Sequence, residues 1–222
     1  MFKWLKKVLL FCFGLSLAVV LLYRFVPVVA TPLMAIRAFE KEKSQGRFLK
    51  DWVPLTKISP HLVQAVIASE DNRFEQHYGF DLKAIEKAVK RNQKGKKRKL
   101  GGSTISMQTA KNAFLWPGRN YIRKGMEAYF TVLIELIWGK KRIMEVYLNV
   151  IEMGPGIYGA EAAAQFYFGK PASQLSKREA CLIAACLPNP IKRNPANPSG
   201  YVQGRAQKIG NLMFKLPKQQ LR

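Results

Sequence analysis

The stretch SPHLVQAVIASEDNRFEQHYGFD, residues 59–81, begins as an amphipathic helix and ends as a polar segment. Ser59 can cap a helix, and Pro60 suits its first turn. The apolar residues that follow recur at three- and four-residue spacing, which is typical of one buried helix face. Glu70 continues that face where the pattern predicts an apolar residue, so its carboxylate is a candidate general base.

An ordinary helix end would produce part of the same pattern. Glu70 and Asp71 would then be solvated carboxylates, and His77 would lie in a turn. A carboxylate pair alone could serve hydrolysis as well as synthesis, or neither. The choice therefore depends on the rest of the chain.

The segment LGGSTISMQTAKNAF, residues 100–114, has the composition of an anion site at the start of a helix. It begins with two glycines and the capping-type Ser103, and Lys111 follows one to two turns later. Free backbone N–H groups at a helix start attract anions, and a lysine adds a full positive charge. The pattern differs from the P-loop GxxxxGK[ST], and glycine pairs also begin many helices for structural reasons alone. It indicates a phosphate contact in combination with other motifs.

The N-terminal segment predicts a single membrane span. The basic sequence MFKWLKK leads into an uncharged run from Val8 to Tyr23, and Arg24 and a further apolar stretch follow. A span needs about 20 apolar residues, so the flanking basic side chains would have to extend toward the two interfaces. We interpret the segment as an uncleaved signal anchor, because its apolar region is longer than in the usual cleaved type. The alternative is a cleaved signal peptide with Val28 and Ala30 at its small-residue site.

The distribution of charge predicts an orientation and a division into two parts. Basic residues before the span would hold the N-terminus in the cytoplasm, so the remaining chain would face outward. Residues 1–31 would form the cytoplasmic N-terminus and the transmembrane anchor. Residues 32–222 would form one extracytoplasmic domain, which is long enough for a substantial core.

The chain is strongly basic, with 37 Lys and Arg against 14 Asp and Glu and a net charge of +23. The densest block is KAVKRNQKGKKRK, residues 87–99, which is poor in apolar residues. Such a run is usually solvated and mobile. The functional alternative is a basic arm at an anionic membrane surface, where each Lys or Arg contributes about 1 kcal/mol. Nucleic acid is a third candidate partner, and the predicted anchor and outward topology argue against it.

Helices account for nearly all of the predicted secondary structure. Capping residues predict helix starts at Ser59, Asp81, Ser103, Asn120 and the Ser176–Glu179 capping box. The predicted helical ranges include 81–92, 120–138, 140–149, 159–168, 180–187 and 201–215. The chain has no alternating apolar pattern and no hairpin signal, which favours an all-α domain. Cys181 and Cys186 are five residues apart on one helix, so we expect free buried thiols rather than a disulfide.

Together the two segments resemble motifs of the peptidoglycan glycosyltransferases, the family that polymerises lipid II into glycan strands. The resemblance continues through RKGMEAYFTVLIELIWGKKRIMEVYLN, the counterpart of the third and fourth motifs, and through YGAEAAAQFYFGK and LIAACLPNP, the counterpart of the fifth. Five motifs in the family's order cover roughly Ser59 to Pro195, which is far more specific than any single motif. Met107 departs from the family, which usually has a second glutamine beside Gln108. The chain is similar to the monofunctional biosynthetic members, because it has no SxxK motif and no room for a penicillin-binding transpeptidase domain.

The resemblance implies an all-α, lysozyme-like glycosyltransferase domain after one transmembrane helix, in the inner membrane of a bacterium. The growing strand, held by its undecaprenyl pyrophosphate, would be the donor. The 4-hydroxyl of an incoming lipid II would attack it with inversion and form a β-1,4 bond. Glu70 would deprotonate that hydroxyl, and Glu127, in the RKxxE pattern, would be the second catalytic carboxylate. The candidate substrate-binding residues are Asp71, Ser103, Thr104, Gln108, Lys111, Asn112, Arg119, Arg123 and Lys124.

A divalent cation, Mg²⁺ or Mn²⁺, is typical of the family and would lie near Glu127 or Asp71. With the basic side chains, it would stabilise the charge of the departing pyrophosphate. Spacing alone places Arg123 and Glu127 on one helix face, which is also the pattern of an ordinary salt bridge. Glu135, within the apolar LIELIW stretch, is predicted to be structural and paired with a basic neighbour. The expected partners are lipid II, the growing glycan strand, membrane lipids and other wall-synthesis or division proteins, and no nucleic acid.

Two other classes of function are compatible with parts of the sequence. A wall-degrading muramidase or lytic transglycosylase would also be rich in helices and use a helix-borne glutamate. Finished wall, however, offers no pyrophosphate to the basic second motif. A membrane-anchored basic binding module for anionic polymers or division partners would need neither carboxylate.

Overall fold

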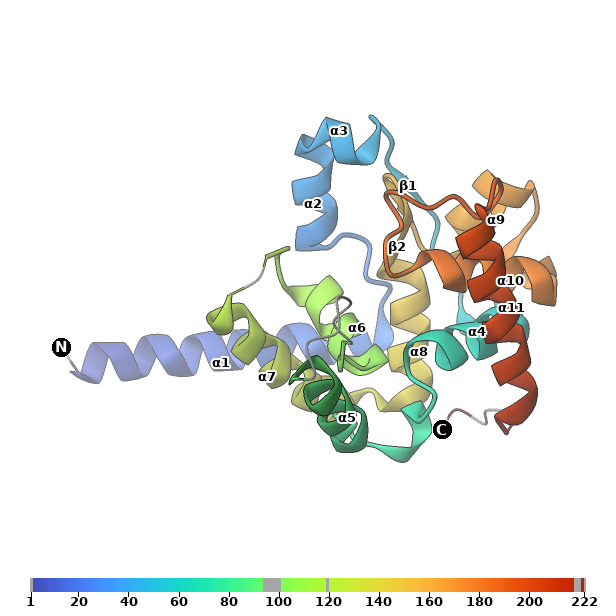
Figure 1. The fold of residues 1–222 in the computed structure, drawn as a ribbon. Coiled ribbons are helices and arrows are strands. Elements are labelled where there is room, and N and C mark those ends of the chain that lie inside the picture. Colours follow the sequence, from blue (N-terminus) through green and yellow to red (C-terminus); the bar gives the residue numbers. More distant parts are fainter. Residues whose placement is uncertain (1, 94–100, 119, 218–220, 222) are drawn as a thin grey trace.

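The computed structural model describes residues 2–93, 101–118, 120–217 and 221, and it is helical almost throughout (Figure 1). The helices in these residues are α1 (Phe2–Phe25), α2 (Pro32–Phe39), α3 (Lys41–Ser44), α4 (Pro60–Glu70), α5 (Leu82–Gln93), α6 (Ile105–Phe114), α7 (Tyr121–Ile137), α8 (Gly139–Val150), α9 (Ala160–Phe168), α10 (Lys177–Cys186) and α11 (Gly200–Lys215). Short 3-10 turns occur at Leu55–Lys57, Phe74–Gln76 and Ala172–Gln174. The helical fold class is confirmed.

Most of the predicted helix starts are confirmed by capping hydrogen bonds. The capping side chains accept backbone N–H groups from the first turn of their helices. The pairs are Ser59 with His61, Asp81 with Ala84, Asn120 with Arg123, and Ser176 with Glu179, whose carboxylate completes the capping box. Local polar chemistry therefore sets these boundaries, as expected for N-cap residues.

The start of α6 differs from the prediction, because Thr104 and not Ser103 is its N-cap. The Thr104 hydroxyl accepts the N–H of Met107 at 3.1 Å and donates to the carbonyl of Gly79 at 2.6 Å. Ser103 is exposed, whereas Thr104 is buried. The contact with the Gly79 segment is distant in sequence, and it selects the second of two adjacent hydroxyl residues as the cap.

A small three-stranded sheet was not predicted. β1 (Leu49–Lys50) runs parallel to β3 (Ile157–Tyr158), and β2 (Glu152–Gly154) pairs antiparallel with β3 across an irregularity. Strands this short cannot display a period-two apolar pattern. Gly156 has a φ of +69°, and a Cβ there would lie 2.2 Å from the carbonyl oxygen of Arg47. Glycine is therefore required where this turn approaches the chain before β1.

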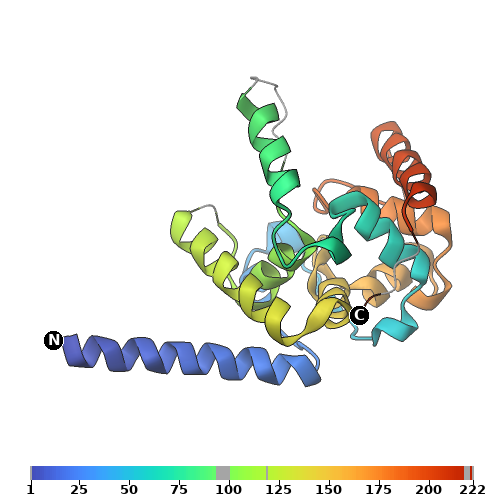
Figure 2. The same cartoon turned by 90° about the horizontal axis from the view of Figure 1, so that it is seen from below.

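The body of the domain consists of two groups of helices around one apolar core. α7 and α8 pack against α6, whereas α10 and α11 pack against α4. α10 is buried from Ala180 to Cys186, and Cys181 and Cys186 are buried free thiols, as predicted. α5 projects from this body (Figure 2). It carries the first part of the basic block, and residues 94–99 of that block lie outside the described residues.

Among the described residues, α1 is the one helix that is long and apolar enough to cross a membrane, over Lys3–Phe25. Its first half extends away from the body, and its second half lies beside α7 (Figures 1 and 2). The indole N–H of Trp138 donates to the carbonyl of Val20 at 2.8 Å, and the guanidinium of Arg142 donates to that of Tyr23 at 2.7 Å. The helix is thus packed onto the domain. The division at residue 31 stays a prediction.

Candidate active site

Glu70 is the last residue of α4, and its carboxylate is held by neutral donors on both oxygens. Oε1 accepts the hydroxyl of Ser69 at 2.9 Å, and Oε2 accepts the Nε2 amide of Gln108 on α6 at 3.2 Å. Arg205 of α11 lies 3.7 Å from Oε1, and the Glu70 side chain is 13% exposed. The carboxylate is therefore fixed between α4, α6 and α11 while it keeps access to solvent.

A small cavity of about 160 Å³ lies beside Glu70. Its lining includes Glu70, Asp81 and the start of the second motif, Gly101 to Thr104. The structure thus brings together the two segments that the sequence placed in one site. Ser103 is exposed on this lining, whereas the hydroxyl of Thr104 is used for the cap of α6.

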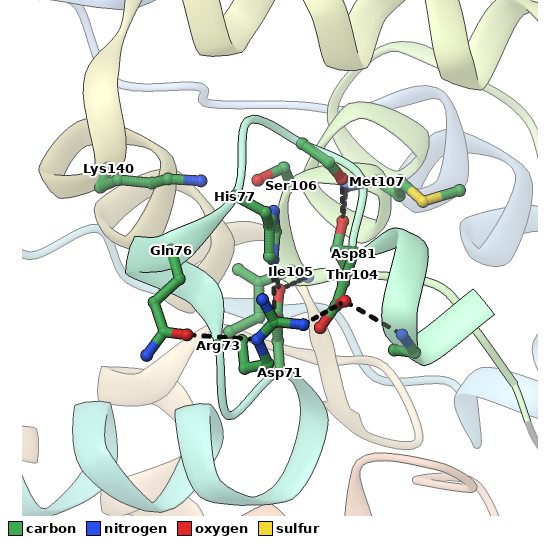
Figure 3. A network of polar contacts seen from close by, with 12 residues as sticks. Asp71, Arg73, Gln76, His77, Asp81, Thr104, Ile105, Ser106, Met107 and Lys140 are labelled. Carbon is green, nitrogen blue, oxygen red and sulfur yellow. Dashed lines mark hydrogen bonds and ion pairs between the residues drawn. The ribbon is translucent and has the colours of Figure 1, made fainter. Parts of the chain in front are cut away.

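Asp71 holds the end of α4 to the start of α6 (Figure 3). Both of its carboxylate oxygens lie 3.0 Å from Nε2 of His77, and Oδ2 accepts the backbone N–H of Ile105 at 3.0 Å. Arg73 and Asp81 form a neighbouring ion pair at 3.0 Å in the same network. Asp71 and His77 therefore connect the two motifs, and a direct substrate contact by Asp71 stays a prediction.

A second cavity, of about 280 Å³, lies on another side of α6 and is lined by Gln108, Lys111 and Asn112. Arg37 of α2 and Glu152 of β2 also line it, together with apolar residues such as Trp116. Gln108 lines this cavity and also hydrogen-bonds Glu70. The pair of Gln108 and Glu70 therefore stands between the two cavities.

Lys111 is a largely buried cation in this second cavity. Burial lowers the pKa of Lys111, the positive charges of Arg123 and Lys124 add to the lowering, and the Glu127 carboxylate opposes it. Within the described part of the chain, Lys111 has no ion-pair partner within 4.0 Å. Because a partly desolvated cation without a directly paired carboxylate is unfavourable, an anionic group in this cavity would stabilise it.

Glu127 of α7 is almost fully buried and is neutralised by two cations. Its side chain is 3% exposed, and Oε2 accepts from the guanidinium of Arg123 at 2.7 Å. Oε1 is paired with Lys124. The predicted shared face of Arg123 and Glu127 is confirmed, and the three residues form one charged cluster that acts electrostatically on Lys111.

The donor groups do not fit a divalent cation that protein side chains alone would hold. Glu127 already binds two cations, and the oxygens of Asp71 are taken by His77 and the Ile105 N–H. In the described ranges, no group of three or more His, Cys, Asp or Glu side chains is arranged for a metal ion. Mg²⁺ usually binds one or two carboxylates and substrate phosphates. The cation stays a prediction.

Other candidate residues are placed as follows. Arg119 lies outside the described residues. Glu135 is structural, as predicted, since Lys140 pairs with it at 2.7 Å and Ser106 also donates to it. Met107 is buried. A methionine at that position therefore packs in the core.

The sequence interpretation missed three side chains near the site. Tyr147 hydrogen-bonds Gln108, Arg205 lies beside Glu70, and Arg37 lines the second cavity. Tyr147 belongs to an apolar helix pattern that indicated only burial. Arg205 and Arg37 lie on helices at opposite ends of the chain, and no local pattern links either of them to Glu70 or Lys111.

Comparison with known proteins agrees with this geometry. The transglycosylase family model matches residues 37–214. A biosynthetic peptidoglycan transglycosylase of Bacteroides thetaiotaomicron is 54% identical over 97% of this chain and 88% of its own length. Proteins with the same name from Bdellovibrio bacteriovorus and Caulobacter vibrioides are 57% and 56% identical, over 94% and 86% of this chain and 84% and 81% of their own lengths. The chain therefore belongs to the transglycosylase family.

Proposed function

We propose that this protein is a monofunctional peptidoglycan glycosyltransferase that polymerises lipid II into β-1,4-linked glycan strands for the cell wall. The observation that carries the proposal is the position of Glu70. Its carboxylate, bonded to Gln108, separates a small polar cavity from a larger one that contains the buried cation Lys111. One side suits a sugar hydroxyl, and the other suits a diphosphate.

In this reaction the donor diphosphate would bind beside Lys111 and the acceptor hydroxyl would bind at Glu70. As the acceptor oxygen attacks the anomeric carbon of the donor, Glu70 takes its proton and the bond to the diphosphate breaks. Attack from the face opposite the leaving group inverts the anomeric centre. The products are a strand longer by one unit and a free lipid diphosphate.

The leaving diphosphate is anionic at neutral pH, so it needs positive charge rather than a proton donor. Lys111 lines the larger cavity, and Arg123 and Lys124 lie close enough to affect its pKa. Such preorganised charge stabilises a developing anion in a site shielded from water. Glu127 would hold Arg123 and Lys124 in place. A divalent cation bound with the diphosphate would add further charge.

Wall hydrolysis is the competing reaction, and the state of Glu127 argues against it. A glycosidase needs one carboxylic acid to protonate the leaving sugar oxygen. Both carboxylate oxygens of Glu127 are engaged in ion pairs with Arg123 and Lys124, so this carboxylate is not free to contact a leaving sugar oxygen. The relatives are also named as biosynthetic transglycosylases.

We further propose that α1 anchors the enzyme as a single span in the bacterial inner membrane, with the N-terminus in the cytoplasm. Lys3, Lys6 and Lys7 precede the apolar run, which supports this orientation. The domain would then act outside the cytoplasm, where lipid-linked precursors are used, and contribute to wall growth and cell shape. Membrane lipids would be its surroundings, and other wall-synthesis proteins its candidate partners.

The test is to supply the purified full-length protein separately with lipid II and with finished wall. We expect polymer and lipid diphosphate from lipid II and no soluble fragments from wall. Product from finished wall alone would refute the synthase assignment. The matched variant Glu70→Gln should bind lipid II and lose nearly all of its polymerisation activity.

A further inference from the structure

Tyr147 of α8 is fully buried, and its hydroxyl faces the side chain of Gln108. The hydroxyl donates to Oε1 of Gln108 at 3.4 Å. Burial raises the pKa of Tyr147 well above its ordinary value, and the nearby charges of Glu70 and Asp71 add to the effect. The hydroxyl therefore stays protonated over the working range and acts as a hydrogen-bond donor.

The amide of Gln108 is thereby engaged at both ends. Its Oε1 accepts from Tyr147, while its Nε2 donates to Oε2 of Glu70 at 3.2 Å. A carboxamide has donors on nitrogen and only acceptors on oxygen. If the amide turned over, its oxygen would face the Glu70 carboxylate and repel it. The Tyr147 hydroxyl favours the orientation that gives Glu70 a donor.

Gln108 also lines the larger cavity with Lys111, so a rotation of its side chain would turn the amide toward that cavity. There its amide would contact the bound donor substrate. We propose that Tyr147 is a positioning residue that keeps the Gln108 amide against the base Glu70. Gln108 would then serve the base rather than the substrate. The kinetic part of this inference rests on the proposed function, and the structural part does not.

The chain offers a matched control in a second fully buried tyrosine. Tyr158 of β3 has no exposed surface, and its hydroxyl has no hydrogen-bond partner among the described residues. Tyr158→Phe and Tyr147→Phe therefore remove the same atom from comparable burial. Only the second substitution removes a hydrogen bond to Gln108.

The first test compares the two variants in steady-state polymerisation of lipid II. In Tyr147→Phe we expect kcat to fall about threefold to tenfold with KM unchanged, the loss typical of one hydrogen bond felt in the transition state. Tyr158→Phe should match the wild type in both constants. A raised KM with unchanged kcat would show that Gln108 serves substrate binding and would overturn the proposal, as would identical constants in the two variants.

The second test needs no activity. Protein labelled with 15N-glutamine in detergent micelles gives side-chain amide signals, and Gln108→Ala assigns the pair that belongs to Gln108. We expect that pair to exchange slowly with water and to shift in Glu70→Gln. Tyr147→Phe should speed the exchange, and Tyr158→Phe should leave it unchanged.

The two tests separate the failure of this inference from the failure of the proposed function. If the wild type makes no polymer from lipid II, the proposed function fails and the amide signals still decide the role of Tyr147. Gln108 signals that are the same in Tyr147→Phe and the wild type would overturn the inference even in an active enzyme.

Discussion

Glu70 and Glu127 are two largely buried carboxylates that receive hydrogen bonds from different kinds of donor. Glu70 is held by the hydroxyl of Ser69 and the amide of Gln108, whereas Glu127 is held by the cations Arg123 and Lys124. The neutral donors orient the Glu70 carboxylate, and its cationic neighbour Arg205 lies farther away, 3.7 Å from Oε1. Two cations neutralise a carboxylate and make it part of a charged scaffold. The contrast supports the proposal that Glu70 transfers the proton and that Glu127 organises the positive charge.

The largest expected effect is that of Glu70→Gln, which removes the proton acceptor and keeps the shape of the side chain. We expect the rate of polymerisation to fall about 10²–10⁴-fold, the usual contribution of a general base. Lipid II binding, measured by equilibrium filtration, should change little. Glu75→Gln is the control, because Glu75 is an exposed glutamate of the same segment. Full activity in Glu70→Gln would end the assignment of this base.

Glu127→Gln should differ from Glu70→Gln in its effect on stability. It leaves the buried Arg123 without its counter-charge, and breaking a buried pair in this way costs about 3 kcal/mol or more. We expect a lower urea midpoint by circular dichroism as well as lower activity. The double variant Arg123→Met/Glu127→Gln should recover stability but not activity. A Glu127→Gln protein as stable as Glu70→Gln would remove the distinction drawn between the two carboxylates.

Lys111 links the charged cluster to the donor cavity, and its charge should appear in the pH dependence of binding. Burial lowers the pKa of Lys111, so this cation is lost at a lower pH than the ordinary lysine value of about 10.4. The KM for lipid II should therefore rise as the pH increases through that lowered pKa. Lys111→Arg should abolish this rise, because a guanidinium stays charged. Lys111→Met should raise KM about tenfold, the loss of about 1.4 kcal/mol of binding.

The measurement is the KM for lipid II as a function of pH in the wild type, Lys111→Arg and Lys111→Met. An alkaline rise that persists in Lys111→Arg would show that another group controls donor binding.

Ser69→Ala is expected to have the smallest effect. It removes one neutral hydrogen bond from Oε1 of Glu70, and it also removes the acceptor that Arg205 contacts at 3.0 Å. We expect kcat to fall about fivefold, which corresponds to about 1 kcal/mol. Ser173→Ala, at an exposed serine, is the control. If Ser69→Ala reduced activity as much as Glu70→Gln, Arg205 would have to be counted with the essential charges.

The helices were predictable where a local polar residue decides the boundary. Asp81, Asn120 and the Ser176–Glu179 box each act within one turn, so their signals are fully contained in the sequence. The choice of Thr104 over Ser103 depends on the carbonyl of Gly79, which no local pattern reports. β1 likewise pairs with a distant segment, Leu49 with Ile157, and the strands are too short to carry a periodic signal.

The candidate site was predictable to the level of its motifs and not to the level of its contacts. The order of motifs joined Glu70 to the second motif and to Glu127. It did not show that Gln108 bonds the base, because spacing on α6 allows that side chain to face either the carboxylate or the larger cavity. It also did not show that both oxygens of Glu127 are paired with cations, Arg123 and Lys124. These ion pairs leave Glu127 without a free oxygen for a metal ion.

Side chains of the domain supply hydrogen-bond donors to the C-terminal end of helix α1. Arg142 donates to the carbonyls of Tyr23 and Val26, and Lys50 donates to those of Val28 and Val29. These are terminal and post-terminal carbonyls that a free helix end would leave to water. A domain on a flexible linker samples many heights and tilts above its membrane. If α1 spans a bilayer, Glu70 instead stays at one height above it, and a lipid-linked substrate needs only a two-dimensional search along the surface to reach it.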